Sequence, residues 1–82
     1  MRIDFSDQVL LVADQIKPIL AGQGSPIQSA ILAELTAIWL AGHIIPDDPE
    51  ETRRLRAELL DGHVRLIRQL IEANAELRKA AE

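Results

Sequence analysis

The chain has 82 residues and a net charge of −4, from 13 acidic and 9 basic side chains, and it contains no cysteine. This length suits one small domain, which we predict to span residues 1–82. Without cysteine there is no disulfide, no thiolate nucleophile and no cysteine-based zinc site, and the weak, mixed charge argues against nucleic-acid binding.

The composition favours helices over strands. Hydrophobic residues make up 48% of the chain, but aromatic residues only 2%. Because strands favour aromatic side chains whereas helices favour Leu and Ala, we predict an all-α fold. No apolar run reaches the roughly 18 residues that a membrane span needs, and the first residues lack the basic-then-apolar order of a signal peptide. We therefore expect a soluble, cytoplasmic protein.

An amphipathic helix is predicted over about residues 6–21, with Asp4 or Ser6 as its cap. Pro18 interrupts this helix, but the apolar stripe keeps its phase through Ile19. A kink at Pro18 is therefore favoured over the alternative, an end of the helix there. The apolar residues that share one face are Phe5, Val9, Val12, Ala13, Ile16, Ile19 and Leu20.

A glycine-rich turn and a second helix, predicted over residues 26–41, come next. Two glycines within residues 21–24 let the chain reverse, which predicts an antiparallel hairpin of the first two helices. Ser25 and Gln28 have the spacing of a capping box, in which each side chain bonds the backbone of the other residue. Gly42 is predicted to end this helix in the left-handed conformation.

The second helix is apolar on nearly every side. Such a helix belongs inside an assembly, so we expect Glu34, which falls among small residues, to be buried and paired. Trp39 is expected to anchor a core or an interface, with its indole N–H bonded to an acceptor. The bulky arc of the helix comprises Ile27, Ile31, Leu32, Leu35, Ile38 and Trp39, and the small arc comprises Ala30, Ala33, Ala37 and Ala41.

The third helix is predicted over residues 49–79, after a capping box formed by Asp48 and Glu51. Its apolar pattern keeps its phase across Gly62, so one continuous helix is favoured over a break. One apolar seam comprises Leu55, Leu59, Leu66, Leu70, Ala73 and Leu77, and a second comprises Leu60, Val64, Ile67, Ile71 and Ala75. The ion pairs expected on the polar side are Asp61–Arg65 and Arg68–Glu72.

Glu34, His43 and His63 are the residues from which a buried metal or acid–base site could be assembled. No ligand spacing such as HxxxH or ExxH connects them, so we predict no catalytic residue, no cofactor and no metal. His43 is instead expected to cap the end of the second helix, and His63 to lie at an interface edge.

One basic cluster, Arg53-Arg54-Leu55-Arg56, directly follows several acidic residues. Local pairing is predicted to neutralise it and leave it solvated. A helix-turn-helix motif is also excluded, because the second helix has almost no polar side chain to offer to base edges. A nucleic-acid or membrane partner is therefore not expected.

A homodimer is predicted, because the second helix is more apolar than two neighbours can cover and the third carries two seams. We expect a non-enzymatic helical protein that self-associates and acts by protein–protein interaction, in an adaptor, regulatory or assembly role. Two alternatives stay open: a mobile-element-type regulator or inhibitor that binds a larger nucleic-acid-processing machine, and a small ligand-binding or catalytic bundle that uses Glu34, His43 and His63. The expected interface residues are Ala30, Ala37, Trp39, Leu59, His63, Leu66, Ile67, Leu70 and Ile71.

Overall fold

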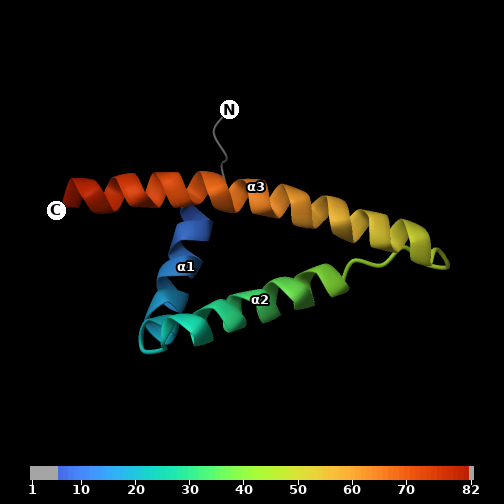
Figure 1. Cartoon of the computed structure of the whole chain (residues 1–82), viewed down its shortest axis with the longest axis horizontal. Coiled ribbons are helices and arrows are strands. Elements are labelled where there is room, and N and C mark those ends of the chain that lie inside the picture. The colour runs from blue at the N-terminus through green and yellow to red at the C-terminus, as the bar shows by residue number, and fades with distance from the viewer. Residues whose placement is uncertain (1–5, 82) are drawn as a thin grey trace. The chain divides into compact units, whose positions relative to one another are not determined.

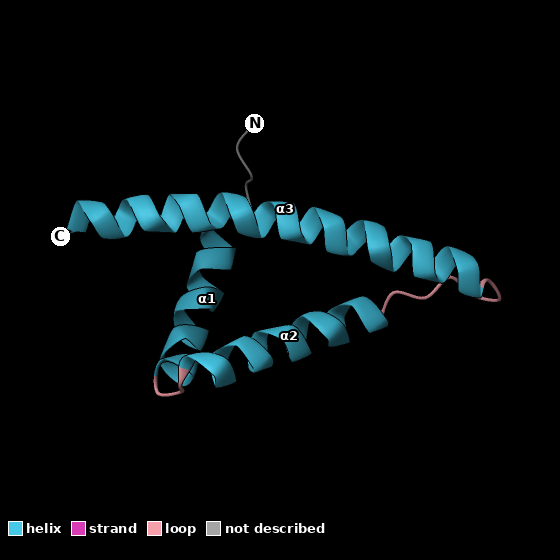
Figure 2. Ribbon diagram, viewed as in Figure 1, coloured by secondary structure: helices cyan, strands magenta, loops and turns pink. Residues whose placement is uncertain are grey.

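Three α-helices and no strand make up residues 6–81, the part of the chain that the computed structural model describes (Figures 1 and 2). They are α1 (Ser6–Ala21), α2 (Ser25–Ala41) and α3 (Pro49–Ala81). The predicted all-α class is therefore confirmed. The expected cap Asp4 and the stripe residue Phe5 lie outside the described residues.

The chain divides into two compact units between Leu35 and Thr36. The first unit contains α1, the turn after it and the first part of α2. The second contains the rest of α2, the loop of residues 42–48 and α3. The antiparallel hairpin, the single domain and the dimer stay predictions.

The turn between α1 and α2 differs from the predicted capping arrangement. α1 continues through Pro18 to Ala21, so the proline does not end it. The backbone N–H of Gln23 then donates to the carbonyl of Leu20 at 2.9 Å. The predicted capping box is wrong, because α2 begins one residue early, at Ser25. The amide Nε2 of Gln28 instead reaches back to the same Leu20 carbonyl at 2.9 Å, and so ties the end of α1 to the start of α2.

The end of α2 is not a left-handed glycine, contrary to the prediction for Gly42. Among the described residues, no glycine has a positive φ. The backbone N–H of Gly42 donates to the carbonyl of Ile38 at 3.1 Å, and that of His43 donates to Leu40 at 3.0 Å. These bonds tighten the last turn, and side chains from outside the helix satisfy further carbonyls there.

The start of α3 confirms half of the second capping box. The backbone N–H of Glu51 donates to Oδ1 of Asp48 at 3.0 Å, as expected of an N-cap aspartate. The Glu51 carboxylate does not return to the cap but pairs with Arg54 at 2.9 Å. Asp47, just before the cap, has a φ of 62°, a left-handed conformation that Asp tolerates better than most residues.

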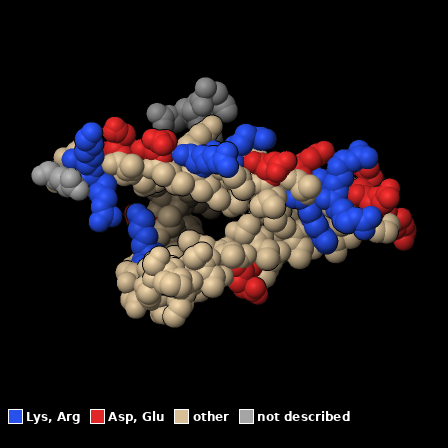
Figure 3. All heavy atoms as spheres, in the orientation of Figure 1, with Lys and Arg blue, Asp and Glu red and all other residues tan. Residues whose placement is uncertain are grey.

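α3 runs without a break through Gly62, as the phase of the apolar pattern favoured. A Cβ added at Gly62 would meet a guanidinium nitrogen of Arg65 at 3.8 Å, which is ordinary contact, and no backbone of another helix. Within residues 6–81, the expected ion pairs Asp61–Arg65 and Arg68–Glu72 do not form; the pairs present there are Lys17–Asp14 and Arg54–Glu51. Charged side chains gather along α3, whereas α2 shows almost none (Figure 3).

No hydrophobic side chain among the described residues is buried. The buried residue in this part of the chain is a polar one, Thr52, at 7% exposure. All three helices carry large apolar side chains that stay exposed, among them Val9 and Ile19 on α1, Ile27 on α2 and Leu70 on α3. Residues 6–81 therefore contain a set of half-buried contacts but no fully buried apolar side chain.

Candidate functional site

Two features of the chain stand out, and they differ in chemistry. The first is the helix connection, by which we mean the last turn of α2, residues 42–48 and the first two turns of α3, all within the second unit. The second is a set of open apolar faces on α2 and α3.

Thr52 is the centre of the helix connection. Its hydroxyl oxygen accepts the backbone N–H of Ile45 at 3.0 Å. Its hydroxyl group lies 2.8 Å from the carbonyl of Asp48 and 3.2 Å from that of Ile45, and its single hydrogen serves one of these acceptors at a time. One buried side chain thus holds the loop against the start of α3 through the backbone at both ends.

Arg56 ties the same part of α3 to the end of α2. Its Nε donates to the carbonyl of His43 at 3.1 Å, and its Nη2 donates to the carbonyl of Ala41 at 2.9 Å. A cation is favoured at a helix C-terminus, where carbonyls lack partners and the helix dipole is negative. The prediction of a wholly solvated basic cluster is therefore wrong for Arg56, which is half-buried, while Arg53 and Arg54 are exposed.

Trp39 lies between the two histidines. Its ring centroid is 5.4 Å from that of His43, in an edge-on arrangement, and 5.1 Å from that of His63, tilted by 49°. Nδ1 of His43 lies 2.8 Å from the carbonyl of Trp39, and it carries the hydrogen because a carbonyl oxygen can only accept. This confirms His43 as a C-terminal cap of α2. His63 is half-buried against the indole.

Trp39 is less enclosed than predicted. It keeps 43% of its surface exposed, and within residues 6–81 no acceptor bonds its indole N–H. Two imidazole rings contact it within the second unit. The indole therefore has room for further contact on one side.

The structure brings His43 and His63 to one indole, but it forms no metal or acid–base centre with Glu34. Across the described part of the chain, no three His, Asp or Glu side chains lie close enough together to hold a metal ion. Glu34 belongs to the first unit and the histidines to the second. Chemically, the indole of Trp39 and the two imidazoles can stack against other groups and donate hydrogen bonds.

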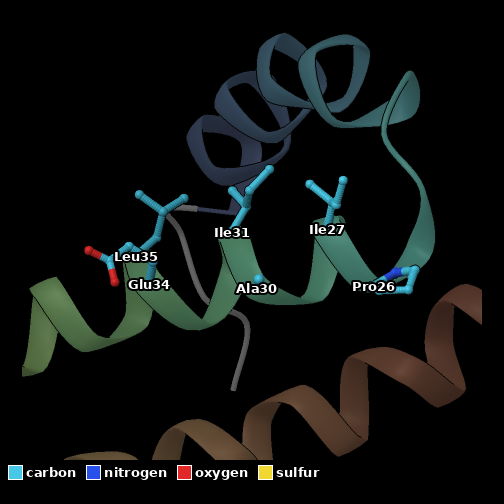
Figure 4. Close-up of a pocket in the computed structure, with 6 residues that line it drawn as sticks. All are labelled: Pro26, Ile27, Ala30, Ile31, Glu34 and Leu35. Atoms are coloured by element: carbon cyan, nitrogen blue, oxygen red, sulfur yellow. The ribbon is translucent and has the colours of Figure 1, made fainter.

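The open face of α2 forms a shallow apolar hollow in the first unit. Figure 4 shows the side chains of Ile27, Ile31 and Leu35 projecting from one side of the helix. Glu34 lines the same hollow, but it is exposed and forms no hydrogen bond or ion pair with another described residue. The prediction of a buried, paired Glu34 is therefore wrong for the described residues of this chain, in which its side chain is exposed. The lining consists of Pro26, Ile27, Ala30, Ile31, Glu34 and Leu35.

The open apolar face of α3 lies after the first four turns of the helix. Leu55, Leu59 and Val64 are half-buried, whereas every residue from Arg65 to Ala81 is exposed. Two of the expected interface residues, Leu59 and His63, are half-buried. The others are exposed, namely Ala30, Ala37 and Trp39 on α2 and Leu66, Ile67, Leu70 and Ile71 on α3.

The roles of Thr52 and Arg56 were not predicted from the sequence. Asp48 and Thr52 have a spacing of four, which places the threonine one turn after an N-cap and allows its hydroxyl to bond the cap carbonyl. Arg56 lies one further turn along the same face. The spacing of Asp48, Thr52 and Arg56 indicated that they share one face of the helix. It could not indicate which carbonyls Arg56 bonds, because these lie 13 and 15 residues away in the sequence.

No protein-family model, curated protein or solved structure matches this chain. A family cannot therefore supply a function, and the proposals below depend on the chain's own residues. None of the described helices combines the length and the hydropathy needed to cross a membrane.

Proposed function

We propose that this chain is a small, non-enzymatic helical protein that self-associates and acts through protein–protein interaction. One observation carries the proposal: large apolar side chains are exposed on all three helices, and no hydrophobic residue is buried among residues 6–81. Monomeric proteins rarely expose contiguous apolar patches of more than a few hundred Å², and larger patches mark interaction sites.

Energetics support the same proposal. Burying a Leu or Ile side chain contributes about 1.5–3 kcal/mol relative to leaving it exposed. α3 alone exposes Leu66, Leu70, Ile71 and Leu77, and each keeps 43% or more of its surface in solvent. A chain of this size is marginal even when its core is complete, so covering these residues by a second molecule would supply much of its stability.

The polar side chains of the second unit support a binding role over a catalytic one. Thr52 and Arg56 are engaged with backbone carbonyls, and His43 with the carbonyl of Trp39. These contacts shape the chain and leave few polar groups to act on a substrate. Glu34 is exposed on a hollow whose other lining is apolar, which suits the edge of a protein contact.

Light scattering coupled to gel filtration tests self-association. At micromolar concentration we expect a mass of at least twice the 9.1 kDa of one chain. A mass of 9.1 kDa together with a cooperative thermal transition would contradict self-association. Affinity capture of the tagged chain followed by mass spectrometry tests the second half of the proposal, and we expect one stoichiometric protein partner that is lost when the exposed apolar residues are changed to charges.

A further inference from the structure

From Leu59 onward, the first apolar seam of α3, taken together with His63 beside it, follows the spacing of a coiled coil. Steps of four and three residues alternate from Leu59 through His63, Leu66, Leu70, Ala73 and Leu77. This alternation averages 3.5 residues per turn, which keeps a seam facing one partner helix along its length. A continuous α-helix carries it, since α3 does not break at Gly62.

The chain itself covers the first part of this seam and leaves the rest open. Leu59 and His63 are half-buried, and the ring of His63 contacts Trp39 from α2 at 5.1 Å. From Leu66 onward every seam residue is exposed, including Leu70 at 48% and Leu77 at 69%. The open seam, which we define as Leu66, Leu70, Ala73 and Leu77, therefore continues a helix–helix contact that already exists.

We propose that the open seam pairs with the open seam of a second copy of this chain, with the two α3 helices antiparallel. The inference deepens the proposed function, because it rests on self-association and names the surface that mediates it. In an antiparallel pair, Leu66 faces the partner's Leu77, and Leu70 faces the partner's Ala73. The two outer layers then each pair two leucines, and the two inner layers each pair a leucine with an alanine, so a large side chain lies opposite a small one in the middle.

A parallel pair packs the same residues less well. It places Ala73 against the partner's Ala73, which leaves a gap between layers of paired leucines, and gaps of this kind destabilise a core. It also places the His63 positions of both copies side by side, although the ring of each His63 already contacts Trp39 of its own chain. The antiparallel pair instead joins open seam to open seam and leaves the Trp39–His63 contact in place.

The residues that flank the open seam suit the antiparallel pair. Gln69 lies beside the partner's Glu76, and its amide can donate to that carboxylate across the edge of the contact. Ile67, exposed at 41%, borders the contact on the other side and lies near the partner's Asn74. The side-chain amide of Asn74 already donates to the carbonyl of Leu70 at 2.8 Å, so it is only partly available for a hydrogen bond to the partner. The apolar rim on that side is therefore provided by Ile67.

Disulfide cross-linking tests the orientation, and the chain has no cysteine of its own. Leu66→Cys and Leu77→Cys chains are mixed under reducing conditions, allowed to exchange, and oxidised. We expect a disulfide-linked dimer in the mixture that contains one chain of each kind, and little from either variant alone, because a disulfide needs Cα atoms within about 7 Å. Arg68→Cys, on the polar side of α3, mixed with Leu77→Cys is the matched control and should not cross-link.

Each result decides one of the two proposals. Efficient self-linking of either variant alone indicates a parallel pair and overturns the inference while self-association stands. Dimer mass with no cross-link in any mixture places the contact elsewhere and also overturns the inference. A monomer mass for the unchanged chain overturns self-association itself. If a Leu66 variant fails to fold, Leu70→Cys with Ala73→Cys tests the neighbouring layer in the same way.

Discussion

The helix connection and the second half of α3 belong to the same unit but are held by different forces. In the connection, Thr52 and Arg56 bond backbone groups directly, with donor–acceptor distances of 2.8–3.2 Å. The second half of α3 has no such tertiary bond among the described residues, and every residue from Arg65 to Ala81 is exposed. A short chain can thus hold a loop in place with a few hydrogen bonds, because every residue except proline carries a backbone donor and an acceptor.

Exposed apolar side chains cannot be stabilised locally in this way. A hydrogen bond contributes about 1 kcal/mol net wherever a partner is within reach, but an apolar side chain is stabilised only when another surface removes it from water. Leu66 and Leu70 have no such surface within the second unit. The connection is thus held by contacts within one chain, whereas the second half of α3 has no comparable tertiary contact among the described residues.

The largest effect is expected from Leu66→Glu, which places a charge in the open seam. If the apolar contact of two copies forms one shared core, this change should abolish the dimer and the cooperative thermal transition together. Arg68→Glu introduces the same residue on the polar side of α3 and should leave both unchanged. Circular dichroism melts and light scattering measure the two properties. A folded, stable Leu66→Glu monomer would show that the second half of α3 needs no partner.

Thr52→Val removes the hydroxyl but keeps the shape of the side chain. It leaves the part-buried N–H of Ile45 without its acceptor, so we expect the free energy of unfolding to fall by about 1–3 kcal/mol. Thr52→Ser keeps the hydroxyl and should retain most of the stability. Urea denaturation at a fixed chain concentration makes the measurement. Equal losses for Val and Ser would show that the methyl group, not the hydrogen bonds, holds the connection.

Arg56→Gln tests the contact between α3 and the end of α2. It removes two charge-assisted bonds to backbone carbonyls that are partly open to water, so we expect a loss of about 1–2 kcal/mol. Arg53→Gln makes the same change at a neighbouring exposed position and should cost less than about 0.5 kcal/mol. Identical urea midpoints for the two variants would mean that the guanidinium bonds contribute nothing measurable.

Gly62→Ala probes the border between the two regions and should have the smallest effect, of opposite sign. The added methyl meets only the far end of Arg65 at 3.8 Å, and Ala is favoured over Gly inside a helix by about 0.5–1 kcal/mol. We therefore expect a small rise in the melting temperature. A loss of dimer mass in this variant would instead show that a second helix crosses α3 closely at residue 62.

Helix type and position were accessible from the sequence because they depend on neighbours along the chain. Helical spacing of apolar residues predicted three helices, and the structure contains them within residues 6–81. The cap at Asp48 was also predictable, since its bond partner is three residues away. The continuity of α3 through Gly62 followed from the phase of its seam.

Predictions that depended on what covers a residue were less successful. Glu34 was expected to be buried, but its side chain is exposed among the described residues. Gly42 was expected to be left-handed, yet α2 ends with tightened backbone bonds, and carbonyls at its end accept hydrogen bonds from His43 and Arg56. The sequence did predict the cap by His43, but it could not indicate that Arg56, across residues 42–48, would reach the carbonyl of Ala41.

The sequence by itself determined the secondary structure of this protein and the pattern of apolar residues along its helices. Both follow from residue type and spacing, which act over a few residues. Only the tertiary structure decided that Thr52 is the buried residue, that Arg56 reaches the carbonyls of Ala41 and His43, and that Trp39 lies between two histidines. These contacts join residues 4 to 24 positions apart in the sequence. Those that cross residues 42–48 depend on how the chain turns after α2 and not on a local preference.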